Sequence, residues 1–337
     1  MKRNIAIIGA GSWGTALSVL LAKNGHQVKM WSCFNEEVEM LNKTREHLHK
    51  LPGVVVPNGV QCTGDVEEAL RGAEAVVMVI PSQTIRKNAK DISKYIKPGA
   101  IVVSCSKGLE DETGLRLSEV LKEEIPDASI VALSGPSHAE EVGKDIPTAI
   151  VAASEVKAAA EYVQDMFMSP KFRVYTNPDI TGVELGGALK NVIAMCAGIS
   201  DGLGFGDNTK AALMTRGITE ISRLGESMGA NIQTFSGLAG IGDLIVTCTS
   251  MHSRNRRAGI LIGQGKTVKE AIDEVKMVVE GVTTTKAAYE LAAKKNVEMP
   301  ITTQAFEVLF NGKNAKQAVV DLMMRDKKFE IEQNSCW

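Results

Sequence analysis

The sequence predicts an α/β protein in which an N-terminal doubly wound sheet is followed by an all-helical C-terminal domain. Three observations lead to this fold class: a glycine-rich turn between a strand and a helix at the start, short apolar runs that alternate with helical patterns through the first half, and the loss of strand patterns after about Asp179. The 337 residues also exceed what one hydrophobic core usually holds. We therefore expect two domains, at residues 1–180 and 181–337.

The glycine-rich turn has the pattern of a dinucleotide-binding site. Residues 5–8 are apolar, as in a strand buried on both faces, and a helical pattern follows the turn. In the G-x-G-x-x-G motif, Gly9 permits a tight turn, Gly11 lets the backbone approach a pyrophosphate, and Gly14 brings helix and strand close together. A second strand at residues 27–31 completes the βαβ unit. A purely structural glycine turn is the alternative, but its position between strand and helix favours a Rossmann-like NAD(P)-binding domain.

The rest of the first half alternates strands and helices. A helix is expected to begin at Asn35, and Asp65 is expected to cap another. Further strands are expected at residues 75–80, 101–104, 130–133, 150–153 and 172–175. Two of these strands are followed by polar loops, Ser106-Lys107-Gly108 and Ser134-Gly135-Pro136-Ser137. Ligands bind beyond the carboxyl ends of the strands in such sheets, so the loops are candidate parts of a site.

Helical patterns fill the second half. They are expected at residues 183–203, 209–227, 254–262, 268–274, 283–295 and 303–309, with glycines between several of them. No low-complexity linker separates the halves. We therefore expect a tight boundary and a ligand cleft between the two domains.

Lys190 stands alone among small and apolar residues in the first of these helices. Its neighbours three and four positions away, which are Gly186, Gly187, Ile193 and Ala194, form no ion pair with a lysine. One interpretation is a surface lysine whose stem lies along a buried helix. The other is a desolvated lysine whose lowered pKa makes it a proton donor or acceptor near neutral pH. The helix alone leaves both open.

A short basic segment follows a second glycine-rich stretch at residues 237–244. Ser253 is suited to cap a helix, so the helix start together with Arg254 and Asn255 predicts a phosphate site. The alternative is a solvated basic turn. Nucleic acid is not expected as a partner, because the segment is short, lacks aromatic neighbours, and belongs to a chain of formal charge -2.

Composition excludes several other classes of protein. No uninterrupted apolar run approaches the length of a membrane span, and the run behind Met1-Lys2-Arg3 ends at Gly9, too early for a signal peptide. The cysteines show no C-x-x-C pair, so neither a zinc site nor a disulfide framework is indicated; they are Cys33, Cys62, Cys105, Cys196, Cys248 and Cys336. We expect a soluble protein of a reducing compartment.

In this order along the chain, the motifs resemble those of the bacterial NAD(P)-dependent glycerol-3-phosphate dehydrogenases. The resemblance covers essentially the whole chain and includes GAGSWGTA at residues 9–16, SKGLE at 106–110, SGPS at 134–137, LKN at 189–191, GIGDL at 240–244, SRNR at 253–256 and VEG at 279–281. It implies reversible hydride transfer between NADPH or NADH and a small-molecule substrate, interconverting dihydroxyacetone phosphate and sn-glycerol 3-phosphate. It further implies a cytoplasmic homodimer without a metal or membrane insertion, whose product feeds phospholipid synthesis.

The same resemblance implies the roles of individual residues. Lys190 would be the proton acceptor, and Lys107 and Asp243 would be the other catalytic residues. The residues that it implies at the cofactor are Gly9, Gly11, Ser12, Trp13, Gly14, Phe34, Lys107, Ala139, Arg254, Val279 and Glu280. Those that it implies at the substrate are Lys107, Gly135, Ser137, Lys190, Asn191, Asp243, Thr247, Ser253, Arg254 and Asn255.

The sequence departs from the family pattern after the second strand. Many members carry an arginine or histidine there that meets the 2′-phosphate of NADPH, whereas Cys33 and Phe34 stand in this chain. Lys43 or Arg45 from the next loop could supply the charge. No aspartate ends the strand either, as it does in many strict NAD enzymes. The preference between NADPH and NADH therefore stays open.

Two rival functions fit the same fold. One is a two-domain dehydrogenase of the 3-hydroxyisobutyrate or 6-phosphogluconate type, which the adjacent Lys190 and Asn191 fit less well. The other is a non-catalytic dinucleotide sensor, which would not require both lysines, Asp243 and the phosphate loop. An assay with dihydroxyacetone phosphate and each reduced cofactor separates them.

Overall fold

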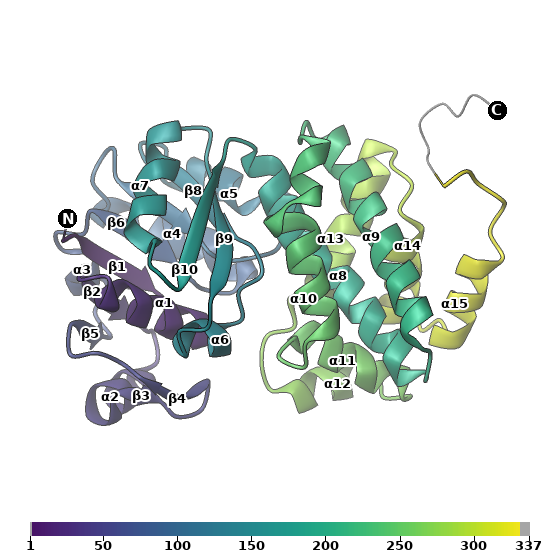
Figure 1. The fold of residues 1–337 in the computed structure, drawn as a ribbon, viewed down its shortest axis with the longest axis horizontal. Helices are drawn as coiled ribbons and strands as arrows, with labels where there is room; N and C mark the ends of the chain where they lie inside the picture. Colours follow the sequence, from purple (N-terminus) through teal and green to yellow (C-terminus); the bar gives the residue numbers. More distant parts are fainter. Residues whose placement is uncertain (1, 331–337) are drawn as a thin grey trace.

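A computed structural model describes residues 2–330 of the chain and confirms the predicted fold class (Figure 1). A Rossmann-like sheet with helices on both faces is formed by the first half, and the second half is helical. Cys336 lies outside the described residues, and the other five cysteines are free thiols.

Eight strands form the main sheet, in the order β10-β9-β8-β7-β6-β1-β2-β5. Their bounds are β1 Asn4–Ile8, β2 Gln27–Trp31, β5 Val60–Thr63, β6 Ala75–Met78, β7 Ile101–Ser104, β8 Ser129–Ser134, β9 Thr148–Ala153 and β10 Phe172–Asn177. Alternate residues of β1 enter two different cores: Ile5 and Ile7 face one, and Ala6 and Ile8 face the other. Burial on both faces explains why the central strands are continuously apolar.

Helices cover each face of the sheet. The core on one face includes residues of α1 (Ser12–Lys23), α6 (Ala139–Gly143) and α7 (Lys157–Phe167). The opposite core includes residues of α3 (Val66–Leu70), α4 (Ile85–Ile92) and α5 (Leu117–Glu124). At α3 the predicted cap is confirmed, because the Asp65 side chain accepts hydrogen bonds from the backbone N–H groups of Glu67 and Glu68. The remaining elements of this half are α2 (Asn35–Thr44) and the 3-10 turns η1 (Ser82–Thr84) and η2 (Ser93–Tyr95).

One feature of the sheet differs from a fully parallel doubly wound sheet. β9 runs antiparallel to β8, and β10 is parallel to β9. The connection from β8 to β9 contains only the five-residue α6, so the chain turns back at the edge where β8 ends. The eleven-residue α7 then carries the chain across to a parallel position for β10.

The helical half is built around α8 (Ile180–Gly202), which is buried along most of its length. Around it lie α9 Asp207–Ser227, α10 Asp243–Thr249, α11 Arg254–Gly263, α12 Val268–Val275, α13 Glu280–Lys295, α14 Pro300–Phe310 and α15 Ala315–Met323, with the 3-10 turn η3 Ile232–Ser236 and the π turn η4 Leu238–Gly242. Among residues 2–330, α8 alone is long and apolar enough to span a membrane, but 89% of its apolar window is buried inside the protein, as in a core helix.

The sequence patterns missed several short elements. β5 and the two-stranded β3 (Glu46–His47) and β4 (Leu51–Val55) form in a stretch interrupted by glycines and prolines, where alternation is too short to read. α10 and α15 were also not expected. α8 begins three residues earlier than predicted, because Asp179 accepts a hydrogen bond from the Gly182 N–H and extends the first turn.

Candidate active site

The turn after β1 fits a dinucleotide. Gly9 has φ +117°, and a Cβ there would stand 2.4 Å from the Val79 carbonyl oxygen. A Cβ on Gly14 would lie 1.9 Å from the Gly9 oxygen, so the helix approaches the turn more closely than any side chain allows. At Gly11, by contrast, nothing lies within 4 Å of a Cβ. The first turn of α1, which includes Ser12 and Trp13, carries no acidic residue. The turn thus leaves an open approach to a helix N-terminus, as a pyrophosphate requires.

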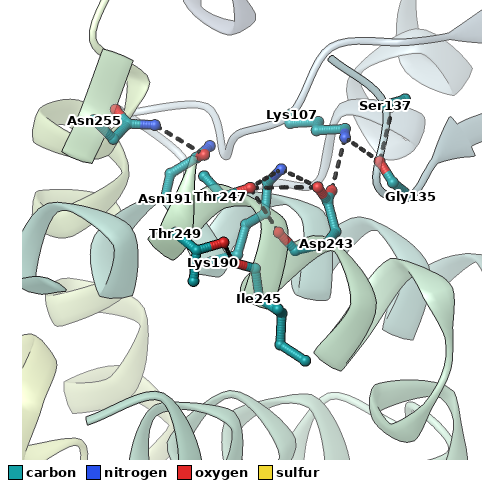
Figure 2. A network of polar contacts seen from close by, with 10 residues as sticks. All are labelled: Lys107, Gly135, Ser137, Lys190, Asn191, Asp243, Ile245, Thr247, Thr249 and Asn255. Atoms are coloured by element: carbon teal, nitrogen blue, oxygen red, sulfur yellow. Dashed lines mark hydrogen bonds and ion pairs between the residues drawn. The ribbon is translucent and has the colours of Figure 1, made fainter. Parts of the chain in front are cut away.

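Lys190 is buried, which removes the interpretation as a surface lysine. Only 6% of the surface of Lys190 is exposed. Its Nζ donates a hydrogen bond to the Thr247 hydroxyl at 2.9 Å and forms an ion pair with Asp243 (Figure 2). Burial lowers the pKa of Lys190 to about 7, even though Asp243 favours the charged form; Lys107 lowers it further. An amine with this pKa exchanges a proton readily near neutral pH.

A single carboxylate joins lysines from both halves of the chain. Lys107, in the loop after β7, donates to Asp243 Oδ2 at 2.7 Å and to the Gly135 carbonyl at 2.9 Å. Lys190 of α8 engages the other oxygen of Asp243. Burial alone would raise the pKa of Asp243, but Lys107 and Lys190 together lower it, so the carboxylate stays ionised between them. The three side chains form one cluster at the junction of sheet and helices (Figure 2).

Local structure explains how Asp243 and Thr247 meet Lys190. Asp243 is the first residue of α10, directly after the glycine-rich π turn η4. Thr247 lies one helical turn further on, and its hydroxyl donates to the Asp243 carbonyl at 2.6 Å. Both side chains therefore project from the same face of α10. The sequence identified the glycine-rich segment but not the helix, so their shared orientation could not be predicted.

The predicted phosphate loop lies at the start of α11. Ser253 caps the helix, because its hydroxyl accepts a hydrogen bond from the Arg256 N–H. Asn255 is buried and donates to Asn191 Oδ1 at 2.9 Å, while its own oxygen accepts from the Gly281 N–H at 2.8 Å. Within residues 2–330, the structure records no hydrogen bond or ion pair for the Arg254 side chain, although it is partly buried. A guanidinium in this position is suited to an anionic ligand.

Several of the remaining predicted residues lie at the carboxyl edge of the sheet. Ser137 donates to the Gly135 carbonyl at 2.9 Å, two residues before Ala139 begins α6. Glu280 reaches the same edge from the helical half, where its carboxylate accepts hydrogen bonds from the backbone N–H of Ser82 at 3.1 Å and from its hydroxyl at 2.5 Å. Val279, which precedes it, is buried in a core of the helical half.

Phe34, in the loop after β2, is 60% exposed, and within residues 2–330 no recorded contact joins it to Lys107 or Lys190. Ser82, the first residue of η1 after β6, was missed by the sequence analysis. The available signal was a polar residue directly after Pro81, beyond an apolar run.

The sheet half provides a glycine-rich turn suited to a dinucleotide, and the helical half holds the titratable amine of Lys190 at the junction. This arrangement meets the needs of hydride transfer. The protein therefore falls in the class of nicotinamide-dependent dehydrogenases. The family model "NAD-dependent glycerol-3-phosphate dehydrogenase N-terminus" matches residues 4–160, and the corresponding C-terminus model matches residues 179–320. The chain belongs to this family.

Comparisons of whole chains agree. A glycerol-3-phosphate dehydrogenase [NAD(P)+] of Desulfitobacterium hafniense is 59% identical over 98% of this chain and 93% of its own. One from Pelotomaculum thermopropionicum is 58% identical over 99% and 96%. The crystal structure of glycerol-3-phosphate dehydrogenase from Coxiella burnetii has a TM-score of 0.93 at 37% identity, covering 96% of this chain and 99% of that one. These matches do not favour either rival function.

Proposed function

We propose that this chain is an NAD(P)-dependent sn-glycerol-3-phosphate dehydrogenase that interconverts dihydroxyacetone phosphate and sn-glycerol 3-phosphate. The observation that carries the proposal is the buried cluster of Lys190, Asp243 and Lys107, which joins the two halves beside a dinucleotide cradle. The bound nicotinamide supplies or accepts the hydride at C2 of the substrate. Every other requirement of the reaction falls to side chains of this chain.

Lys190 is proposed to move the proton. When the C2 carbonyl is reduced, its oxygen gains negative charge, and a protonated Lys190 delivers a proton to it. In the reverse direction a neutral Lys190 removes the proton from the C2 hydroxyl. Its pKa of about 7 makes both forms available near neutral pH. Thr247 and Asp243 hold the amine in place for this transfer.

Lys107 and Asp243 are proposed to stabilise the developing charge and to fix the geometry. Lys107 adds a second cation beside the reacting oxygen. Asp243 holds the two amines at a set separation, because each of its oxygens binds one of them. Gly135 and Ser137 are proposed to contact the substrate beside this cluster, where the Gly135 carbonyl accepts a hydrogen bond that orients Lys107.

The phosphate of the substrate is proposed to bind at the start of α11. Arg254 and the N-terminal turn that Ser253 caps would hold it, with Asn255 and Asn191 beside it. This anchor is remote from the reacting carbon, so its binding energy positions C2 at the cluster. On the cofactor side, we propose contacts from Gly9, Gly11, Ser12, Trp13, Gly14, Phe34, Lys107, Ala139, Arg254, Val279 and Glu280.

Three broader proposals accompany this function. The boundary between the NAD(P)-binding and substrate domains is proposed at residues 180 and 181, close to the point where β10 ends and α8 begins. The enzyme is proposed to act as a cytoplasmic homodimer without membrane insertion, which light scattering during gel filtration and cell fractionation would test. Its product is proposed to feed glycerophospholipid synthesis.

The activity is tested with the purified full chain. Dihydroxyacetone phosphate with NADPH or NADH should give oxidation of the reduced cofactor, followed by its absorbance. Parallel reactions contain 3-hydroxyisobutyrate or 6-phosphogluconate with the oxidised cofactors. Turnover with one of these acids and none with dihydroxyacetone phosphate would overturn the proposal. If none of the substrates is turned over, the result would support the non-catalytic rival.

A further inference from the structure

The loop between α10 and α11 leads directly into the proposed phosphate anchor. It leaves α10 after Thr249 and enters α11 at Arg254, and between them the chain has neither helix nor strand structure. Helix α10 supplies Asp243 and Thr247 to the buried cluster (Figure 2), and α11 begins at the Ser253 cap. A bound phosphate can place C2 of the substrate at the cluster only if this loop is held at a fixed distance from it.

The side chain of Arg256 holds this loop. Its Nη1 donates a hydrogen bond to the Thr249 carbonyl at 2.9 Å and lies 3.0 Å from the sulfur of Met251 in the loop. Its Nε and Nη2 lie 2.9 Å and 2.7 Å from Oδ2 of Asp201, in the last turn of α8. One guanidinium therefore joins the end of α10, the loop, and the helix that carries Lys190.

This ion pair is mostly buried and is anchored twice. The side chains of Arg256 and Asp201 are 13% and 15% exposed, and Lys210 of α9 binds the other oxygen of Asp201 at 2.8 Å. A carboxylate is unfavourable in the last turn of a helix unless cations bind it. Because buried ions lose their hydration, such a network adds little stability beyond what apolar side chains would give. The planar guanidinium instead fixes the directions of its contacts, so its main contribution is to position the loop.

Arg256 is not itself available to a phosphate. The contacts described above engage all three of its side-chain nitrogens. Arg254 projects from a different side of α11, because residues two apart on a helix do not face each other. Within residues 2–330 no hydrogen bond or ion pair is recorded for its side chain. Arg254 is thus the available ligand, and Arg256 acts behind it.

We propose that Arg256 is a positioning residue for the substrate phosphate, because it holds the loop against Asp201 and so sets where Ser253 and Arg254 stand relative to Lys190. The inference rests on the proposed function for its kinetic test but not for its binding test. The covalent structure of the substrate fixes the distance between its phosphate and C2. A displaced loop therefore cannot bind the phosphate and leave C2 at Lys190, and a misplacement of about 1 Å can cost about 100-fold in rate.

The kinetic test compares dihydroxyacetone phosphate with dihydroxyacetone, which lacks the phosphate. In Arg256→Gln, kcat/KM for the phosphate ester should fall about 10- to 100-fold, whereas kcat/KM for dihydroxyacetone should stay within about twofold. Arg71→Gln removes an arginine from an exposed ion pair with Glu67; it is the matched control and should resemble the wild type. Equal losses with both substrates would show a general distortion and overturn the inference.

Two further variants test whether Arg256 acts through its contacts and its neighbour. Arg256→Lys keeps a charge beside Asp201 but cannot bind Asp201 and the Thr249 carbonyl together, so it should show the same selective loss even if Arg256→Gln folds poorly. In an Arg254→Gln background, Arg256→Gln should cost less than it does in the wild type, because a positioning residue acts through the ligand that it places. A full additional loss there would contradict the positioning role.

A binding test separates this inference from the proposed function. Calorimetric titration with inorganic phosphate, in the presence of saturating adenosine 5′-diphosphate to occupy the glycine turn, measures the phosphate site without turnover. Arg254→Gln and Arg256→Gln should each weaken phosphate binding about 10-fold, and Arg71→Gln should not. If the chain reduces no dihydroxyacetone phosphate but shows these losses, the function fails and the positioning role stands. If Arg256→Gln binds phosphate as the wild type does, the positioning role fails whatever the activity.

Discussion

At the scale of single residues, the proposed chemistry depends on the protonation of Lys190. Burial disfavours the charged form of the amine, whereas the Asp243 carboxylate favours it, and together they leave Lys190 with a pKa of about 7. A surface lysine would stay protonated and could not accept a proton at neutral pH. The burial of α8 is therefore part of the proposed catalytic machinery.

Removing the amine should strongly reduce turnover without unfolding the protein. In Lys190→Met the stem is kept and Asp243 retains Lys107 as a partner. We expect kcat to fall by about 10²- to 10⁴-fold, the range for losing a general acid or base, while the Kd for NADPH, measured by fluorescence titration, stays within a factor of about two. Lys294→Met, on the exposed side of α13, is the control. Near-normal turnover would remove Lys190 from the mechanism.

The pH profiles of the two directions should be opposite. Reduction needs protonated Lys190, so its kcat/KM should be high below pH 7 and fall above it. Oxidation needs the neutral amine, so its kcat/KM should rise through pH 7 and level off above it. Initial rates in both directions across a pH series check this. Profiles that bend the same way near neutrality would contradict the assignment.

At the scale of elements, α8 and α11 approach each other through glycine. A Cβ on Gly259 would lie 2.1 Å from the Met195 carbonyl oxygen and 2.9 Å from the Ile199 nitrogen, both in the backbone of α8. Backbone atoms do not move aside as a flexible side chain does. This close contact fixes α11, and with it the Ser253 cap and Asn255, relative to Asn191 on α8.

We therefore expect Gly259→Ala to lower the free energy of unfolding. Overpacking should cost about 1–3 kcal/mol, which exceeds the gain of up to about 1 kcal/mol in helix propensity. Denaturant titration measures the change, with Thr209→Ala on the exposed face of α9 as the control. The KM for dihydroxyacetone phosphate should also rise. If the free energy of unfolding of Gly259→Ala were unchanged or higher, the close contact between α8 and α11 would not be needed for stability.

Local signals predicted the elements well, and long-range contacts explain what was missed. Asp65 was recognised as a cap because its partners are two and three residues away. The helix around Lys190 did not reveal its partner, because Asp243 lies 53 residues later in the chain; only the family resemblance suggested it. The reversal of β9 likewise depends on the length of α6, which no apolar pattern reveals. Residue patterns suggested the glycine turn, Lys190 and the loop at Ser253, and resemblance suggested the other site residues, whereas the network that joins them required the fold.

At the scale of the whole molecule, polar contacts join the sheet half to the helical half. Besides Lys107 with Asp243 and Ser82 with Glu280, a buried pair links Arg116 of the sheet half to Glu184 of α8 at 2.8 Å. Glu184 also accepts hydrogen bonds from the backbone N–H and the hydroxyl of Ser118. These contacts hold the two halves in one arrangement around the site.

Breaking the buried pair should uncouple the two halves. Glu184→Ala leaves Arg116 largely buried with Glu119 as its remaining carboxylate, and we expect a loss of about 3 kcal/mol. In a Trp337→Phe background, fluorescence reports on Trp13 and Trp31 in the sheet half, while circular dichroism is weighted toward helix. The two unfolding curves should coincide in the parent and separate in Glu184→Ala. Glu119→Ala, which removes the more exposed partner, should leave them coincident; separation there as well would contradict this role for Glu184.

The arrangement of one carboxylate between two amines has an electrical consequence. With both amines protonated, the trio carries one net positive charge, which attracts a developing alkoxide. Once Lys190 has given up its proton the trio is neutral, and the newly formed alcohol is no longer held by a surplus of charge. In the proposed mechanism, the proton transfer that completes the reaction thus also weakens the binding of the product.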